Sequence, residues 1–163
     1  MSKLVGQESS FKGTINKTYK DSEPWFEIPE HPGEDAPNIV VVLLDDTGFA
    51  QLGCYGSSID TKNIDSLARG GLQFTNFHVT PLCSPTRASL LTGRSQHAVG
   101  MRSVSNFKTG FPNMLGHITN KAATIAEILN SKGYATFCLG KWHLAPMEDC
   151  SAAGPFNQWP LGR

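Results

Sequence analysis

Cys83 stands in the part of the sequence best suited to chemistry, the run Cys-Ser-Pro-Thr-Arg. Pro85 fits the first turn of a helix, where its missing N–H costs nothing, and Gly93 fits the left-handed residue just past the helix end. We therefore predict a short helix capped by Cys83 or Ser84. A thiol there faces unpaired backbone N–H groups and the positive end of the helix dipole, and Arg87 adds a cation. This combination favours an anionic ligand.

Two adjacent carboxylates follow the most apolar run of the chain. Residues 38–44 read Asn-Ile-Val-Val-Val-Leu-Leu, a β-branched stretch too short for a buried helix, and Asp45 and Asp46 come next. Such a run predicts a central strand of a parallel sheet. Acidic residues at the carboxyl end of a strand lie where open α/β sheets bind ligands. The alternative is a turn with two solvated acids.

A lysine and a histidine follow a second predicted strand. Residues 134–139 are largely apolar and are followed by Gly-Lys-Trp-His-Leu, in which Lys141 and His143 stand two positions apart. Their side chains point the same way if the backbone stays extended. Either residue alone would indicate little about function.

The spacing of Cys83, Pro85 and Arg87, followed by Ala-Ser-Leu-Leu-Thr-Gly-Arg, resembles the signature of the formylglycine-dependent sulfatases (arylsulfatases) of the alkaline-phosphatase superfamily. The run Gly-Lys-Trp-His-Leu at 140–144 resembles a second motif of that family. The resemblance covers nearly all of residues 37–163. Without the resemblance, Cys83 would also fit the role of a small buried hydrophobic residue.

The resemblance implies a sulfuric ester hydrolase that acts on small sulfate esters. A maturation enzyme would convert Cys83 into formylglycine, whose hydrated aldehyde supplies the attacking hydroxyl. The implied cofactor is Ca²⁺, or alternatively Mg²⁺, since hard oxygen ligands suit these ions. The implied catalytic residues are Cys83, Arg87, Lys141 and His143. The implied sulfate ligands are Arg87 and Lys141, and the implied metal ligands are Asp45, Asp46 and the modified Cys83.

The order of the remaining patterns predicts an α/β fold. We expect a helix at 63–70, a strand with one buried face at 72–79 and a long functional loop at 95–119. A capping box at Thr124–Glu127 starts another helix, which Gly133 ends and which should bury Ile125, Ile128 and Leu129. Alternation of strand and helix favours a mostly parallel sheet with flanking helices. By resemblance this is an incomplete alkaline-phosphatase-like sulfatase fold.

Two segments differ in composition. Residues 1–37 are polar and carry prolines without a helical or alternating period, which predicts an extended arm on the surface. Residues 38–163 would be the N-terminal portion of a sulfatase catalytic domain, truncated at the C-terminus. By resemblance, the later Asp-Asn calcium pair and the later histidine and lysine that assist the leaving group would be missing from this sequence.

Charge and cysteine content exclude several classes. The 163 residues have a net charge of zero, yet no carboxylate occurs between Asp65 and Glu127, an interval with six basic residues. This local excess favours an anionic substrate or forms a solvated basic face.

The four cysteines lack zinc spacing, and nothing indicates nucleic-acid binding. We expect no signal peptide and no membrane span, and hence a cytoplasmic protein.

Three functional hypotheses remain open. The first is a sulfatase whose visible part carries the nucleophile. The second is a phosphonate or phosphate ester hydrolase on the same scaffold, because tetrahedral anions need similar cationic clamps. The third is an inactive fragment that lacks the second half of the metal site and holds metal weakly.

Overall fold

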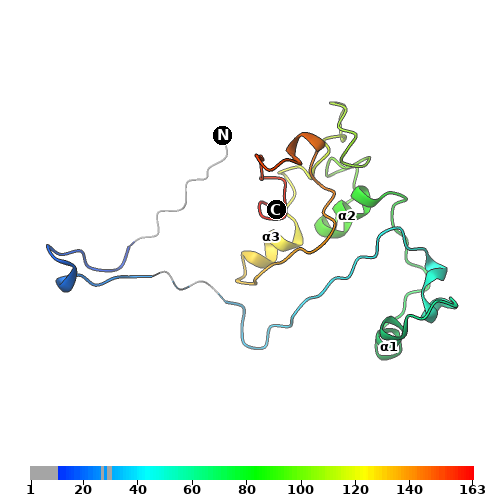
Figure 1. Ribbon diagram of the computed structural model, residues 1–163, viewed down its shortest axis with the longest axis horizontal. Helices are drawn as coiled ribbons and strands as arrows, with labels where there is room; N and C mark the ends of the chain where they lie inside the picture. The colour runs from blue at the N-terminus through cyan, green and yellow to red at the C-terminus, as the bar shows by residue number, and fades with distance from the viewer. Residues whose placement is uncertain (1–10, 27, 29–30) are drawn as a thin grey trace.

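The computed structural model of the protein describes residues 11–26, 28 and 31–163 (Figure 1). Helices α2 and α3 lie among the loops of the second half of the chain, whereas α1 lies to one side. Across the described ranges, each helix is too short or too polar to span a lipid bilayer. The elements in chain order are η1 (Tyr19–Asp21), η2 (Phe49–Gln51), η3 (Gly53–Tyr55), α1 (Lys62–Gly70), α2 (Cys83–Thr92), α3 (Ile125–Asn130) and η4 (Met147–Asp149).

Helix α2 begins one or two residues earlier than predicted. The predicted cap at Cys83 or Ser84 is wrong, because Leu82 has the extended backbone of the residue before the helix and Cys83 is already helical. The Ser84 hydroxyl instead accepts a hydrogen bond from a loop outside the helix. The predicted end is confirmed, since Gly93 is left-handed with φ 63°. The Cys83 side chain is thus not used as a cap.

A small hydrophobic core holds α2 against the loops that follow it. Its members are fully or nearly fully buried, and Leu91 and Trp142 pack against them. They are Ala88, Val99, Met101, Ile118, Ala122 and Leu144. Since Trp142 and Leu144 flank His143 in the chain, this core fixes the predicted His143 segment beside α2.

Helix α1 and the glycine-rich loop at residues 47–56 form a local unit. The helix predicted at 63–70 is confirmed as Lys62–Gly70. The Asp65 carboxylate accepts hydrogen bonds from the Cys54 backbone N–H and from the Thr61 hydroxyl, both at 2.8 Å. The Thr61 hydroxyl accepts in turn from the Gly53 N–H at 2.7 Å. One carboxylate therefore folds the loop onto the helix.

The long loop predicted at 95–119 is confirmed as irregular structure. A single antiparallel bridge between Met101 and Met114 pins its two arms together. Gly100 lies beside it with φ 87°, and a β-carbon there would stand 2.7 Å from a methyl group of Leu115. This close approach requires glycine. The bridge and the glycine hold the loop close to the core.

Helix α3 starts at the predicted capping box. The Thr124 hydroxyl accepts from the Glu127 N–H at 3.2 Å, and the Glu127 carboxylate accepts from the Thr124 N–H at 2.6 Å. The buried stripe predicted for this helix is wrong, because Ile125 and Ile128 are exposed. The helix packs instead at its N-terminal end, where the Thr124 hydroxyl donates to the Arg163 carbonyl at 2.8 Å.

The predicted strands at 38–44, 72–79 and 134–139 are not paired. None of the described residues belongs to a strand longer than an isolated bridge, and Figure 1 draws these segments as open traces. Val40 is 82% exposed and Leu139 is 95% exposed. A strand forms only when a neighbour accepts its backbone hydrogen bonds, and these segments have no such neighbour in the described part of the chain. A parallel sheet is therefore not observed.

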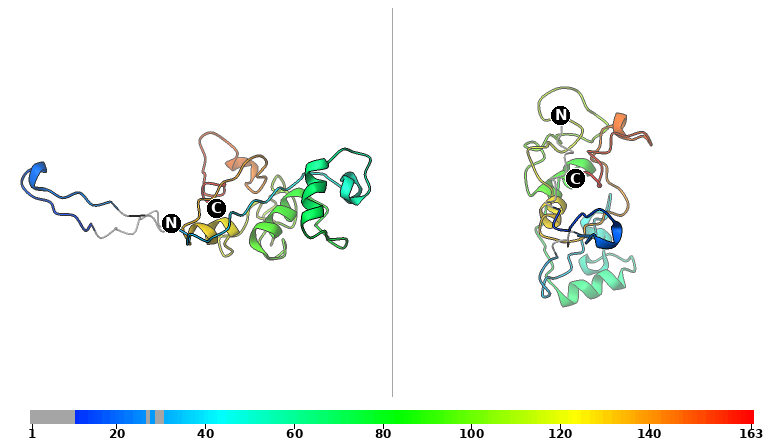
Figure 2. Two further views of the ribbon diagram at one scale, coloured as in Figure 1. Left: turned by 90° about the horizontal axis from the view of Figure 1, so that it is seen from below. Right: turned by 90° about the vertical axis from the view of Figure 1, so that its left-hand side faces the viewer.

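The arm predicted at 1–37 lies partly outside the described residues. Its described part makes one antiparallel bridge, between Thr14 and Glu23, around the 3₁₀ turn η1. Figure 1 and the left view of Figure 2 agree that this part extends away from α2 and α3. It contributes no side chain to the region around Cys83.

Replacing Thr124 should destabilise the contact between α3 and the C-terminal segment. Thr124→Ala removes a capping hydroxyl and the bond to the Arg163 carbonyl, which together should cost about 1 to 2 kcal/mol of unfolding free energy. Urea unfolding followed by tryptophan fluorescence measures this change. Thr124→Ser is the matched control, because it keeps the hydroxyl and should lose much less. Equal stability of the two variants would contradict the assignment.

The exposed run before Asp45 should make the chain self-associate. Unpaired, apolar, extended segments are templates for intermolecular pairing. Val40→Lys combined with Val42→Lys should lower the associated fraction in sedimentation velocity without changing the far-ultraviolet circular dichroism. Leu161→Lys is the control at an equally exposed apolar side chain outside this run. An associated fraction that both variants lower equally would show that this run is not the contact.

Candidate active site

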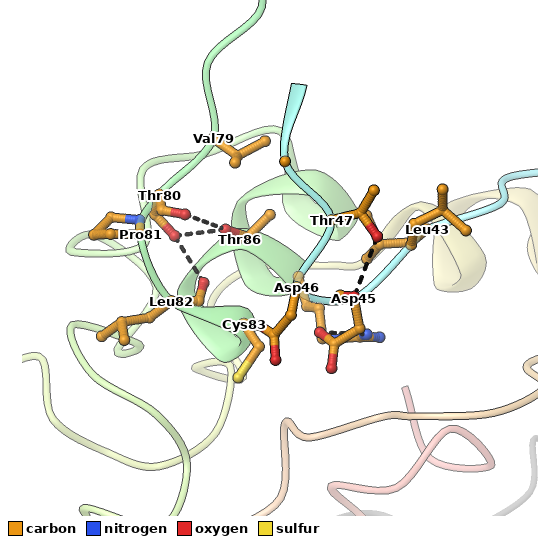
Figure 3. A pocket seen from close by; sticks show the side chains of 13 residues that line it. Leu43, Asp45, Asp46, Thr47, Val79, Thr80, Pro81, Leu82, Cys83 and Thr86 are labelled. Atoms are coloured by element: carbon orange, nitrogen blue, oxygen red, sulfur yellow. Dashed lines mark hydrogen bonds and ion pairs between the residues drawn. The ribbon is translucent and has the colours of Figure 1, made fainter. Parts of the chain in front are cut away.

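Cys83 lines a pocket between the start of α2 and residues 43–48. The pocket has a volume of about 270 Å³ and is lined by residues 43–48, 79–83, Thr86 and Arg87. Figure 3 shows Asp45, Asp46 and Cys83 among its walls, from these two parts of the chain. The two carboxylates and the thiol, which lie about 40 positions apart in the sequence, thus share one pocket.

Arg87 joins three segments. Its side chain is only 11% exposed, and one guanidinium nitrogen, Nη1, donates to the Lys141 carbonyl. The other, Nη2, lies 3.4 Å from Oδ1 of Asp45. Its Nε is buried and has no acceptor among the described residues. A buried guanidinium needs such partners, so Arg87 brings the acidic pair and the lysine segment to the same side of α2.

Asp45 also pairs with Lys141. The Lys141 ammonium donates to Oδ2 of Asp45, the carboxylate oxygen that Arg87 does not contact. This hydrogen bond is the largest reason why the pKa of Asp45 is lowered, and Arg87 lowers that pKa further against an opposing effect of burial. The same bond raises the pKa of Lys141. Both groups are therefore charged at neutral pH.

His143 faces Cys83 across a short distance. Its Nδ1 lies 3.1 Å from the Cys83 sulfur, and its backbone is left-handed with φ 55°. Burial is the main cause that lowers the pKa of His143, and the charges of Lys141 and Arg87 lower it further. The ring is thus held toward its neutral form, in which one nitrogen keeps a lone pair.

Asn106 and Ser105 are parts of the site that the sequence analysis does not single out. The Asn106 side-chain oxygen lies 2.7 Å from Nε2 of His143. The Ser105 N–H donates to the buried Ser84 hydroxyl at 3.2 Å. Both residues lie in the irregular loop, where no period or spacing links them to a partner. Only the three-dimensional contacts identify them.

The acidic pair fits calcium in the type of its ligands but not in their number. Asp45 and Asp46 offer carboxylate oxygens at one pocket, and calcium prefers about 6 to 8 oxygens. Both Asp45 oxygens already contact cations. Within the described part of the chain, no group of three or more histidine, cysteine or acidic residues is arranged to hold a metal. The residues present would therefore hold only part of a calcium coordination shell.

The sequence of the chain matches one known protein family. The profile of the family described as Sulfatase matches residues 37–161, well over half of the chain. The chain belongs to the sulfatase family. The match begins just before the predicted acidic pair and includes every candidate site residue, from Asp45 to His143.

Several curated sulfatases are similar to the chain over most of its length. Human arylsulfatase A is 46% identical over 110 residues, which are 66% of this chain and 21% of that protein. Human steryl-sulfatase is 41% identical over 130 residues, 77% of this chain and 22% of that protein. An uncharacterised sulfatase of Schizosaccharomyces pombe is 39% identical over 120 residues, 69% and 22% respectively. The chain thus spans about a fifth of the length of these relatives.

Proposed function

We propose that this chain carries the nucleophile and the anion clamp of a sulfuric ester hydrolase that acts on small sulfate esters. The observation that supports this most is the convergence of Cys83, Arg87, Lys141 and His143 with Asp45. Three contacts between side chains and one hydrogen bond from Arg87 to a backbone carbonyl join the three segments. The names of the relatives, arylsulfatase A and steryl-sulfatase, support the same class of reaction.

The cations of the site suit the recognition of a sulfate group. Arg87 is held by the Asp45 carboxylate and by the backbone carbonyl of Lys141. The second contact keeps Lys141 close to Arg87. Two positive charges beside residue 83 would balance the charge on sulfate oxygens as a bond to sulfur forms or breaks. Lys141 would exchange its bond to Asp45 for a bond to the substrate.

We propose that residue 83 acts as formylglycine, whose aldehyde hydrate has two hydroxyl groups. One would attack the sulfur and displace the alcohol of the ester, and loss of the proton from the other would then eliminate sulfate and restore the aldehyde. His143 is placed to take a proton from a group on residue 83, because its Nδ1 already lies 3.1 Å from the sulfur there. Asp45 and Asp46 would be the ligands of Ca²⁺, or alternatively Mg²⁺, which would supply charge stabilisation at the same pocket.

We also propose that residues 38–44 and 134–139 are strands of a mostly parallel α/β sheet in a complete sulfatase domain. The relatives are about five times longer than the matched part, and both segments are apolar and exposed here. Segments of this composition are stable when both faces of a sheet are covered.

Cys83 should be converted to an aldehyde when the chain is produced together with a formylglycine maturation enzyme. Mass spectrometry of the tryptic peptide that ends at Arg87 should show the aldehyde in place of the thiol, while Cys54 keeps its thiol. Pro85→Ala should reduce the conversion, because the resemblance implies that this proline is part of the recognised sequence. Unmodified Cys83 in the unaltered chain would contradict the formylglycine proposal.

A second test measures the hydrolysis of an aryl sulfate by the chain that carries the modified Cys83. Where the modified chain releases sulfate from an aryl sulfate, Cys83→Ala should lower the rate to background. Cys138→Ala should leave the rate unchanged, because Cys138 is exposed and away from the pocket. An aryl phosphate is assayed in parallel, and faster turnover of the phosphate would favour the phosphate ester hydrolase over the sulfatase. Turnover of neither ester would favour the inactive fragment.

Calcium should bind this chain weakly, with a dissociation constant above the micromolar range. Two carboxylates supply fewer oxygens than the ion prefers, and Asp45 is also held by two cations. Titration calorimetry measures the affinity, and Asp46→Asn should weaken it further. Asp60→Asn is the control, since Asp60 pairs with Lys62 on the surface. Micromolar or tighter binding in the unaltered chain would show that other groups complete the site.

A further inference from the structure

We propose that Asn106 is a positioning residue that holds the His143 imidazole with its proton on Nε2 and its free Nδ1 directed at residue 83. The importance of this for catalysis depends on the proposed function, in which His143 takes a proton from residue 83. The arrangement of the ring depends only on contacts within the chain.

The first step of the argument is the placement of the two ring nitrogens. Nε2 of His143 lies 2.7 Å from the side-chain oxygen of Asn106, and Nδ1 lies 3.1 Å from the Cys83 sulfur. A carbonyl oxygen only accepts hydrogen bonds, so the nitrogen that faces it must carry the proton. In a neutral ring, the other nitrogen then has a lone pair. That lone pair faces Cys83.

The second step is the anchor of Asn106, which is itself exposed. The preceding residue, Ser105, is buried, and its N–H donates to the fully buried Ser84 hydroxyl at 3.2 Å. Ser84 is the neighbour of Cys83 at the start of α2. A closed ring of contacts therefore runs from Cys83 through His143, Asn106, Ser105 and Ser84 back to Cys83. The loop cannot shift without breaking a buried hydrogen bond.

The third step is the charge around the ring. Lys141 and Arg87 are the cations near this ring, and both of them engage Asp45. Asn106 is neutral, so it orients the imidazole without adding a negative charge that would favour the imidazolium. An aspartate in its place would orient the ring in the same way but would change this balance.

The test reads the proton position directly and requires no turnover. The full chain is labelled with ¹⁵N-histidine, and long-range ¹H–¹⁵N spectra are recorded at a pH at which His143 is neutral. The unaltered chain should show His143 protonated on Nε2. Asn106→Ala should lose the hydrogen-bonded Nε2 proton signal and allow an Nδ1-protonated form to appear. Asn106→Asp should retain protonation on Nε2, because a carboxylate also accepts.

A matched control exists in the same chain. Asn76 contacts Nε2 of His78 at the same distance of 2.7 Å, and neither residue lines the pocket. Asn76→Ala should leave the His143 signals unchanged. Ser84→Ala, which removes the anchor of the loop, should shift the His143 signals in the same direction as Asn106→Ala. If circular dichroism shows that Asn106→Ala does not fold, the His143 signals of Asn106→Asp and Ser84→Ala are compared with those of the unaltered chain, and this comparison tests the proposal.

Two results would overturn the proposal. One is an unaltered chain with His143 protonated on Nδ1, which would mean that Asn106 donates to the ring. The other is a folded Asn106→Ala or Ser84→Ala variant with unchanged His143 signals. Where the modified chain turns over an aryl sulfate, Asn106→Ala should lower kcat by about tenfold or more with little change in KM. Expected spectra without any turnover would leave the positioning role intact and count against the proposed function alone.

Discussion

The buried guanidinium of Arg87 is the constraint on which the rest of the site depends. A charge removed from water must find partners, and Arg87 finds the Asp45 carboxylate and the Lys141 carbonyl. These groups lie 42 and 54 positions away from it in the sequence. Satisfying one side chain of α2 therefore brings the acidic pair and the lysine segment together. Loss of either contact would leave a guanidinium N–H of Arg87 without its acceptor.

The same contacts give the pocket a balanced set of charges. Asp45 and Asp46 offset Arg87 and Lys141, and the lowered pKa of Asp45 and the raised pKa of Lys141 show that the pairing keeps both partners charged. In the proposed function, a sulfate ester would compete with Asp45 for Lys141. A cation that engaged Asp45 would relieve that competition, so anion and cation binding at this pocket should favour each other.

The parts of this structure that the sequence predicts are those with local causes. The left-handed Gly93 and the capping box at Thr124 follow from contacts within one turn of chain, and both are confirmed. The strand at 38–44 depends on a partner elsewhere in the chain, and its apolar composition alone cannot supply one. Asn106 escapes prediction for a related reason, since nothing in its irregular loop encodes the distance to His143.

The site is nevertheless arranged without a sheet, and the reason lies in which contacts position it. Helix α2 presents Cys83, Ser84 and Arg87 within its first five residues. Cys83 and Arg87 both contact the segment of Lys141 and His143, Arg87 also contacts Asp45, and Ser84 contacts Ser105 in the irregular loop. The small core, which contains Ala88 and Leu144, packs against the same helix. Because these bonds are short and partly or fully buried, one helix end and one core suffice to orient the thiol, the guanidinium and the imidazole. A sheet would add support to Asp45 and Lys141 from the strands that precede them, whereas the contact between His143 and Cys83 already depends on α2 and the loop that contains Asn106.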